Sequence, residues 1–217
     1  MPADRKAVLA ATIAIIALVA AFTPAGCIST SNTTAEATGQ EQNAPDPQAE
    51  LERNVQYVRE NAGNLASMIH ELINEKRKEN GLDSLHWDQQ LETIALSHSR
   101  DMAQRDYFDH ISPEGKDFAD RYKEHGYTKE TVVGDKVYVG GENLFLNNVV
   151  ESYTYDQVTS EIHEYVFNNL DRLARSTVDG WMESPGHREN ILAPFSREGI
   201  GVIVTDEGDV YITENFS

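Results

Sequence analysis

The chain of 217 residues has a single cysteine, Cys27, so no disulfide can form within it. Basic residues are also scarce, because 18 Lys and Arg stand against 36 Asp and Glu, and the formal net charge is −18. Proteins that bind nucleic acid need a basic surface, and this sequence has no basic stripe. The composition therefore excludes a disulfide scaffold and argues against a nucleic-acid partner. The folded part must depend on a hydrophobic core.

One long uncharged stretch is present, at the N-terminus. Arg5 and Lys6 precede an uncharged run from Ala7 to Phe22, and "TPAG" then leads to Cys27. A positive start followed by an apolar run is typical of an export signal, and small residues before a cysteine resemble the lipobox of secreted lipoproteins. Residues 1–27 are thus predicted to be a signal peptide with lipidation at Cys27.

An uncleaved membrane anchor is the alternative for residues 1–27, because the uncharged segment is about as long as a helix that spans a bilayer. In both cases the positive end stays inside the cell. The sequence therefore predicts an extracytoplasmic protein, attached to the outer face of the cell membrane.

The next part of the chain, residues 28–62, is predicted to be a disordered tether with a charged lead-in. Residues 28–48 are rich in Ser, Thr, Asn, Gln and Pro and show no apolar periodicity, which is typical of a flexible segment. Residues 49–62 are charged and compatible with a helix. The folded domain is expected at residues 63–217.

Helical patterns dominate the first half of this domain. Asn64 is expected to cap a first helix that ends at Gly81, and Asp88 a second helix. His98 lies on the apolar stripe of the second helix, so we expect it to be a hydrogen-bonded core residue. A third, short helix is predicted around residues 118–125.

The second half of the domain mixes helical and strand patterns. "GGENLF" contains the paired Gly140 and Gly141, which permit positive φ or a close backbone approach. Residues 156–180 show helical spacing, read as two helices, and the last residues form two β-rich runs around a turn at 206–209. This grouping predicts an α+β domain with an antiparallel sheet covered by helices.

The stretch "WMESPGHRENIL" places a histidine at the start of a short predicted helix. Ser184 suits the N-cap and Pro185 the first helical position, so His187 should lie in the first turn. The free N–H groups and the helix dipole there disfavour an imidazolium. We therefore expect His187 to be neutral, either as a ligand or proton acceptor or as an ordinary surface residue.

Four segments, in order, resemble the CAP (SCP-like) superfamily of cysteine-rich secretory, antigen 5 and pathogenesis-related 1 proteins. They are "HSRDMAQRDYFDH", "GGENLF", "GWMESPGHRENIL" and "IGVIVTDEGDVYITENF", and the resemblance covers residues 65–216. It is closest to the disulfide-free prokaryotic branch. The resemblance implies a three-layer α-β-α sandwich with a central antiparallel sheet, and a surface cleft in which polar residues meet.

The family resemblance also implies a site. His110 in "YFDH" and His187 in "SPGHR" match paired histidines that can bind a divalent metal, usually zinc, and Glu142 in "GGEN" matches a first glutamate. Ser184 stands where eukaryotic members have a second glutamate, and Glu183 and Asn190 are further cleft candidates.

Two histidines fall short of the three protein ligands of a tight zinc site, so metal binding should be weak and lost as the histidines protonate near pH ~6. Glu142 would either ligate the metal or orient an imidazole. The alternative is a hydrogen-bonded knot of Glu142 and the two histidines that ties three loops together without a metal.

Compared with compact prokaryotic members, the chain carries an insertion around residues 146–170, which we expect to rim the cleft and to contact a specific ligand. The preferred function is an exported, membrane-tethered binding or scaffold module whose ligand is a lipid, a small molecule or a cell-surface component. A metal-assisted hydrolase with Glu142 as base and a lipid-binding protein are the alternatives. The sequence leaves open whether the protein is an enzyme.

Overall fold

The computed structural model describes residues 46–217. The predicted signal peptide or anchor with Cys27 and the predicted tether up to residue 45 lie outside this range. Among the described residues, no helix is both long and apolar enough to cross a membrane. In chain order the elements are α1 (Pro47–Glu60), α2 (Ala62–Glu79), β1 (His86–Trp87), α3 (Gln89–Arg105), α4 (Phe118–Glu124), β2 (Thr131–Val133), β3 (Lys136–Tyr138), β4 (Gly141–Asn148), β5 (Val150–Tyr155), β6 (Ile162–Phe167), α5 (Leu170–Glu183), α6 (Pro185–Leu192), β7 (Arg197–Val204) and β8 (Asp209–Phe216).

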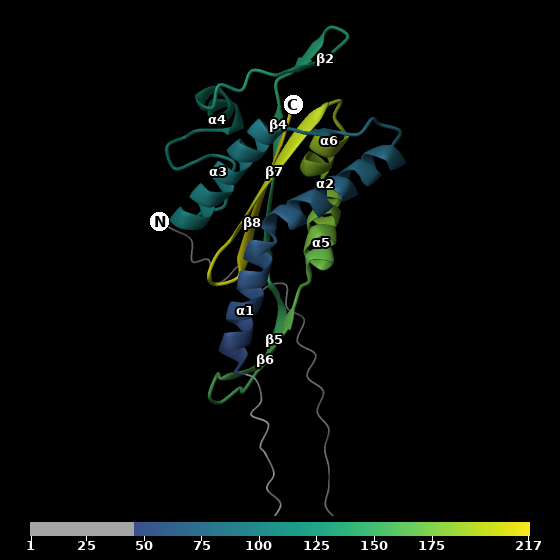
Figure 1. Ribbon diagram of the computed structural model, residues 1–217. Coiled ribbons are helices and arrows are strands. Elements are labelled where there is room, and N and C mark those ends of the chain that lie inside the picture. The colour runs from purple at the N-terminus through teal and green to yellow at the C-terminus, as the bar shows by residue number, and fades with distance from the viewer. Residues whose placement is uncertain (1–45) are drawn as a thin grey trace, which may run out of the picture. The chain divides into compact units, whose positions relative to one another are not determined.

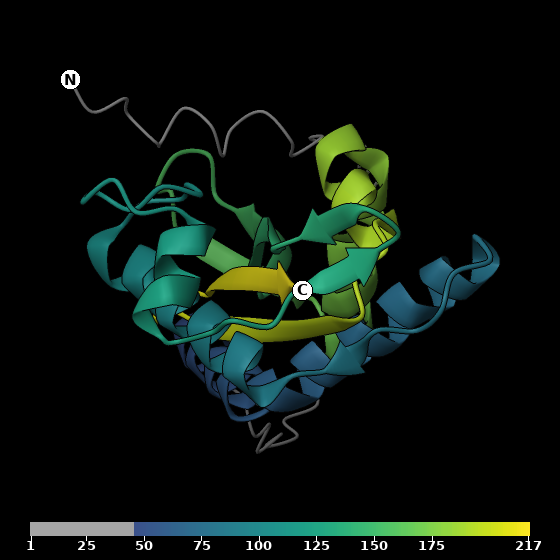
Figure 2. The same ribbon diagram turned by 90° about the horizontal axis from the view of Figure 1, so that it is seen from above.

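The fold is α+β with three layers, as expected. The main sheet has the strand order β1-β7-β8-β4, in which β7, β8 and β4 pair antiparallel. The short β1 adds a parallel edge beside β7, which the sequence did not predict. α3 and α4 lie to one side of the sheet and α5 and α6 to the other (Figures 1 and 2). β4 is thus an edge strand, next to α5 and α6.

The two faces of β7 differ in the kind of residue they present. Ile200 and Val202 belong to the main hydrophobic core, which α1, α2, α5 and α6 complete. Gly199 and Gly201 point the other way, toward α3, because successive residues of a strand alternate between faces. A Cβ atom at Gly201 would lie 2.2 Å from the backbone nitrogen of Leu96. The absence of side chains at these glycines therefore allows α3 to pack directly on the strand.

Local capping sets most helix ends. The Asp88 carboxylate accepts hydrogen bonds from the backbone N–H groups of Gln90 and Leu91 and so begins α3, as predicted. Gly81 follows α2 with a φ of 74°, also as predicted. The expected cap at Asn64 was wrong, because α2 already begins after Asn61.

The folded unit also begins earlier than residue 63. It extends from Asp46, and α1 contributes the buried Val55 and Val58 to the main core. The charged lead-in is therefore an integral helix of the domain.

The prediction of helix for residues 156–169 was wrong. The chain forms a hairpin there, with β5 antiparallel to β6, and only α5 follows the predicted helical pattern. Four aromatic rings line one face of this hairpin and contact one another, those of Tyr153, Tyr155, Tyr165 and Phe167. Such cross-strand ring pairs stabilise a hairpin, and they depend on a partner strand that the helical spacing of one segment does not reveal.

The close packing of α3 on β7 gives a stability prediction. Gly201→Ala should destabilise the protein by about 1–3 kcal/mol or more, because the new methyl group would overlap the backbone of α3. The control is Gly63→Ala in α2, where no atom lies within 4 Å of the new Cβ, and it should stabilise by about 0.5–1 kcal/mol. Urea unfolding of both variants measures this, and an unchanged midpoint for Gly201→Ala would contradict the packing.

Candidate functional site

The edge strand β4 separates two groups of polar side chains. Glu142 lies opposite Asn215 of β8, and Asn143 lies opposite Glu214. Because neighbouring residues of a strand face opposite sides of a sheet, Glu142 points toward α3 and Asn143 toward α5 and α6. The "GGEN" segment therefore supplies polar groups to both faces at one end of β4.

Gly140 makes this approach of the chain to β4 possible. Its φ is 150°, and a Cβ atom there would lie 2.6 Å from the Tyr122 ring and 2.9 Å from the carbonyl oxygen of Phe216. Gly140 therefore confirms the prediction that the paired glycines permit a positive φ or a close backbone approach.

Glu142 is the centre of the first group. Its side chain is almost fully buried, and its Oε1 lies 2.9 Å from Nδ1 of His110. Its Oε2 accepts a hydrogen bond of 2.6 Å from Arg121 of α4. Arg121 also donates to the carbonyl oxygen of His110. One buried carboxylate thus joins β4, α4 and the loop after α3.

His110 and His187 lie side by side, and together with Glu142 they form what we call the histidine cluster. The ring centroids of the two histidines are 6.3 Å apart. His110 comes from the loop after α3, and its side chain is 49% exposed. His187 comes from the first turn of α6, where the sequence placed it. Because Nδ1 of His110 donates to the carboxylate, its Nε2 is free to bind a ligand.

The environment keeps His187 neutral. Burial lowers the pKa of this imidazole below the usual value of about 6.5, and the charge that His110 can carry lowers it further. The neutral state agrees with the sequence-based expectation, although the structure attributes it to burial and His110 rather than to the helix dipole.

Two further residues belong to the surroundings of Glu142. His98 is buried in α3, as predicted, and its Nε2 lies 3.1 Å from the carbonyl oxygen of Asp109 and 3.9 Å from Oε1 of Glu142. Burial lowers the pKa of His98, so the ring is neutral beside the carboxylate. Arg121 was not predicted, and nothing in its short helix distinguishes it from the other charged residues in the sequence.

The other predicted cleft residues have different positions. Asn190 donates hydrogen bonds to the carbonyl oxygen of Glu142 at 3.1 Å and to Oδ1 of Asn143 at 2.9 Å, so it attaches α6 to β4. Ser184 stands at the N-cap position of α6, but its hydroxyl makes no capping bond. Glu183 lines a separate depression with Lys76 and Arg188. The structure therefore brings Asn190 to the histidine cluster and leaves Glu183 apart from it.

The insertion does not border the histidine cluster. Glu142 lies at the start of β4, and β5 begins after the end of this strand of eight residues. At ~3.3 Å per residue, the start of β5 is about 26 Å from Glu142 along the chain. The β5–β6 hairpin lies beside α1, at the end of the domain opposite α4 and β2 (Figure 1). The expectation that the insertion rims the site was wrong.

The side chains gathered at the histidine cluster do not make a tight metal site. Among residues 46–217, no group of three or more His, Cys, Asp or Glu side chains is arranged to hold a metal ion. Glu142 is already bound to His110 and Arg121, so it orients an imidazole instead of offering a free ligand. Only the imidazoles of His110 and His187 remain as candidate metal ligands in this cluster.

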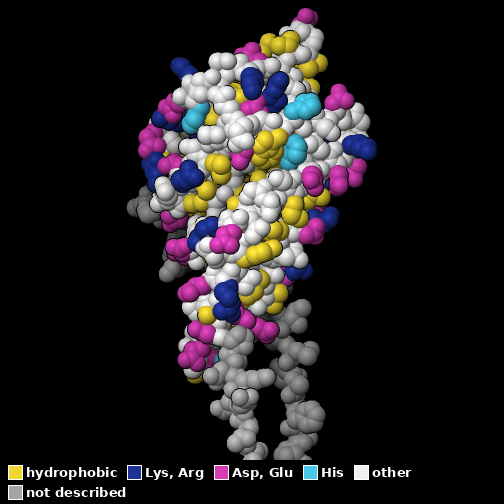
Figure 3. Space-filling model, viewed as in Figure 1, with side chains coloured by type: hydrophobic (Ala, Val, Ile, Leu, Met, Phe, Trp, Pro, Cys, Tyr) yellow, Lys and Arg dark blue, Asp and Glu magenta, His cyan; other side chains and the backbone are white. Residues whose placement is uncertain are grey.

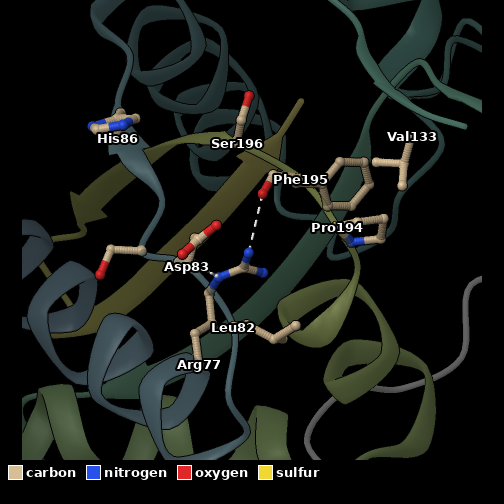
Figure 4. A pocket seen from close by; sticks show the side chains of 9 residues that line it. Arg77, Leu82, Asp83, His86, Val133, Pro194, Phe195 and Ser196 are labelled. Atoms are coloured by element: carbon tan, nitrogen blue, oxygen red, sulfur yellow. Dashed lines mark hydrogen bonds between the residues drawn. The ribbon is translucent and has the colours of Figure 1, made fainter.

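A further depression, lined by none of the three residues of the histidine cluster, is drawn in Figure 4. It has a volume of about 570 Å³ and is bordered by the end of α2 and the connection from α6 to β7. Leu82, Val133, Pro194 and Phe195 give it an apolar wall. Arg77 at its floor donates hydrogen bonds to the carbonyl oxygens of Phe195 and Asp83 and so holds the wall in place.

Comparison with known proteins identifies the class to which this fold belongs. A family model described as the cysteine-rich secretory protein family (CAP) matches residues 70–216. The chain belongs to this family.

Individual relatives are similar over the same domain. Two come from Bacillus subtilis (strain 168): the uncharacterized protein YkwD is 31% identical over 149 residues, which are 68% of this chain and 45% of YkwD. The uncharacterized membrane protein YlbC is 29% identical over 149 residues, which are 68% of this chain and 33% of YlbC. The match therefore spans less than half of either relative.

A solved structure has the same fold. An outer surface protein from Borrelia burgdorferi superimposes with a TM-score of 0.51 at 17% identity, covering 71% of this chain and 92% of that protein.

The proximity of the two histidines gives a prediction for pH. The pKa of His187 should lie below about 6.5. Below that pH the unfolded chain binds a proton at His187 more readily than the folded protein does. The contribution of His187 to stability is therefore present above about 6.5 and is lost as the pH falls through its pKa in the folded protein. His110→Ala should raise the pKa of His187, because it removes the neighbouring charge. Histidine NMR titration measures the pKa of His187 in the parent and in His110→Ala. His163→Ala, in the distant hairpin, is the control, and an equal shift in that variant would contradict the assignment.

Proposed function

We propose that this CAP protein is an extracytoplasmic, membrane-tethered binding module that captures a divalent cation between His110 and His187. The single observation that carries the proposal is the contact of these two imidazoles, with the Nε2 of His110 left free by the bond of its Nδ1 to Glu142. Neutral imidazole nitrogens are preferred ligands of zinc.

Two features support the location and the cation. Arg5, Lys6 and the uncharged run from Ala7 to Phe22 have the order of an export signal or anchor, and the relative YlbC is named a membrane protein. Acidic side chains outnumber basic ones on the face drawn in Figure 3, in keeping with the net charge of −18. Such a surface raises the local concentration of cations.

Cation binding at this site is expected to be weak and reversible. Two imidazoles supply half of a tetrahedral zinc shell, and water would supply the rest. Protonation competes with the metal, so affinity falls as the pH drops through the histidine pKa values. No observation favours the hydrolase alternative, because both oxygens of Glu142 are occupied by His110 and Arg121.

A zinc titration tests this function. Calorimetry on residues 46–217 should show binding at pH 7.5 that is lost at pH 5.5 and lost in His110→Ala and in His187→Ala. His163→Ala, a histidine outside the cluster, should bind as the parent does. If the His110→Ala/His187→Ala double variant gives the same heat as the parent, the proposed site is wrong.

The depression in Figure 4 favours a second candidate, the binding of a small apolar ligand. A volume of about 570 Å³ is within the range of small-molecule sites. We expect native mass spectrometry of residues 46–217, mixed with a medium-chain fatty acid, to show a complex that Val133→Asp weakens. Val158→Asp, at a position that is 92% exposed between β5 and β6, is the control. Bare protein in every sample would count against this candidate.

A further inference from the structure

Two glutamates are fully buried beneath the histidine cluster, on the opposite face of the sheet from Glu142. Glu198 of β7 and Glu214 of β8 have no exposed surface. Ile200 pairs with Glu214 across the two strands, so Glu198, two residues before Ile200, is a diagonal neighbour of Glu214 on the same face. The two carboxyl groups are therefore neighbours within the core.

Each of the two carboxyl groups has one oxygen with a hydrogen-bond partner and one without. Oε1 of Glu198 pairs with Nδ1 of His70 on α2, and Oε2 of Glu214 accepts a hydrogen bond of 3.0 Å from the amide of Asn143. The remaining two oxygens, Oε2 of Glu198 and Oε1 of Glu214, are buried and have no hydrogen-bond partner within the described part of the chain. Ionised carboxylates only accept hydrogen bonds, so two that face each other need a proton between them.

We propose that Glu198 and Glu214 share one proton, and that this singly protonated pair positions the first turn of α6, and with it His187, through Asn143. The amide nitrogen of Asn143 that donates to Glu214 also donates to the carbonyl oxygen of His187 at 3.2 Å. The amide oxygen of Asn143 accepts from Asn190 at 2.9 Å. The role assigned to His187 rests on the proposed function, whereas the shared proton does not.

The surrounding charges favour a single ionised carboxylate. Burial first, and then the charge of Glu198, raise the pKa of Glu214 well above its usual range. Burial acts to lower the pKa of His70, but the hydrogen bond and charge of Glu198 outweigh it and raise that pKa. The raised pKa of Glu214 favours the proton on its side of the pair, and His70 pairs with Glu198 on the other side.

Arg77 does not replace the shared proton. Its guanidinium donates to the backbone carbonyl oxygens of Asp83, Ile191, Ala193 and Phe195, so it acts on the carboxyl pair only through its charge. The remaining titratable groups that act on His70 or Arg77 are Glu71 and Asp83. If the shared proton is lost, two adjacent buried carboxylates repel each other, and the hold of Glu214 on Asn143 weakens.

Infrared spectroscopy of the full-length chain at pH 7 tests the shared proton. A band of a protonated carboxyl group, shifted on exchange into D₂O, should be present in the parent and absent in Glu214→Gln. That variant keeps both hydrogen bonds, because its amide accepts from Asn143 and donates to Glu198. Glu164→Gln, at an exposed position in β6, should keep the band. A parent without the band, or an unchanged band in Glu214→Gln, overturns the proposal.

NMR titration of His187 in the full-length chain tests the positioning role. Asn143→Ala should raise the pKa of His187 toward about 6.5, because the turn moves away from His110 and into water. Glu214→Gln should leave that pKa low. Asn147→Ala, on the same strand but bonded to Ser176 of α5, is the control. An unchanged pKa in Asn143→Ala overturns this role.

The two proposals fail separately, because neither the infrared nor the NMR readout uses zinc. A failed zinc titration with the infrared band and the His187 shift intact would end the cation-binding function and leave the acid pair and its hold on His187 standing.

Discussion

The buried carboxylate of Glu142 is the charge on which the arrangement of the histidine cluster depends. Arg121 neutralises it, His110 donates to it, and the same arginine holds the backbone of His110. Removing one partner of such a buried pair leaves an uncompensated charge, which typically costs about 3–5 kcal/mol. The histidines can therefore be presented to solvent with defined orientations even though they are carried by a loop and by a short helix.

Much of the fold could be predicted from the sequence because its signals are local. Asp88 caps a helix with its own carboxylate, Gly81 adopts a positive φ, and the last two strands flank a turn. The β5–β6 hairpin could not be predicted in this way. Val158, Ile162, Tyr165 and Val166 fit helical spacing, but Tyr165 contacts Tyr153 on the other strand, and this contact outweighs the local pattern.

The site was harder to predict from the sequence than the fold. His110 and His187 are far apart in the sequence, and only the family resemblance indicated that they belong together. Asn143 and Glu214 carry no local signal, because their roles arise from the pairing of β4 with β8, and Arg121 has its role only because α4 packs near Glu142. A shift of that register by one residue would exchange the faces of Glu142 and Asn143. Strand register is a property of the assembled sheet, and one sequence alone does not specify it.

The position of β4 at the edge of the main sheet has a consequence for association between copies of the protein. An open strand edge offers unpaired backbone groups to a second chain. Here the indole of Trp181 donates to the carbonyl oxygen of Leu144 at 2.9 Å, and Asn190 donates to that of Glu142. These backbone acceptors are already occupied by side chains of α5 and α6. α5 and α6 thus withhold these two acceptors on the β4 edge from a strand of another copy.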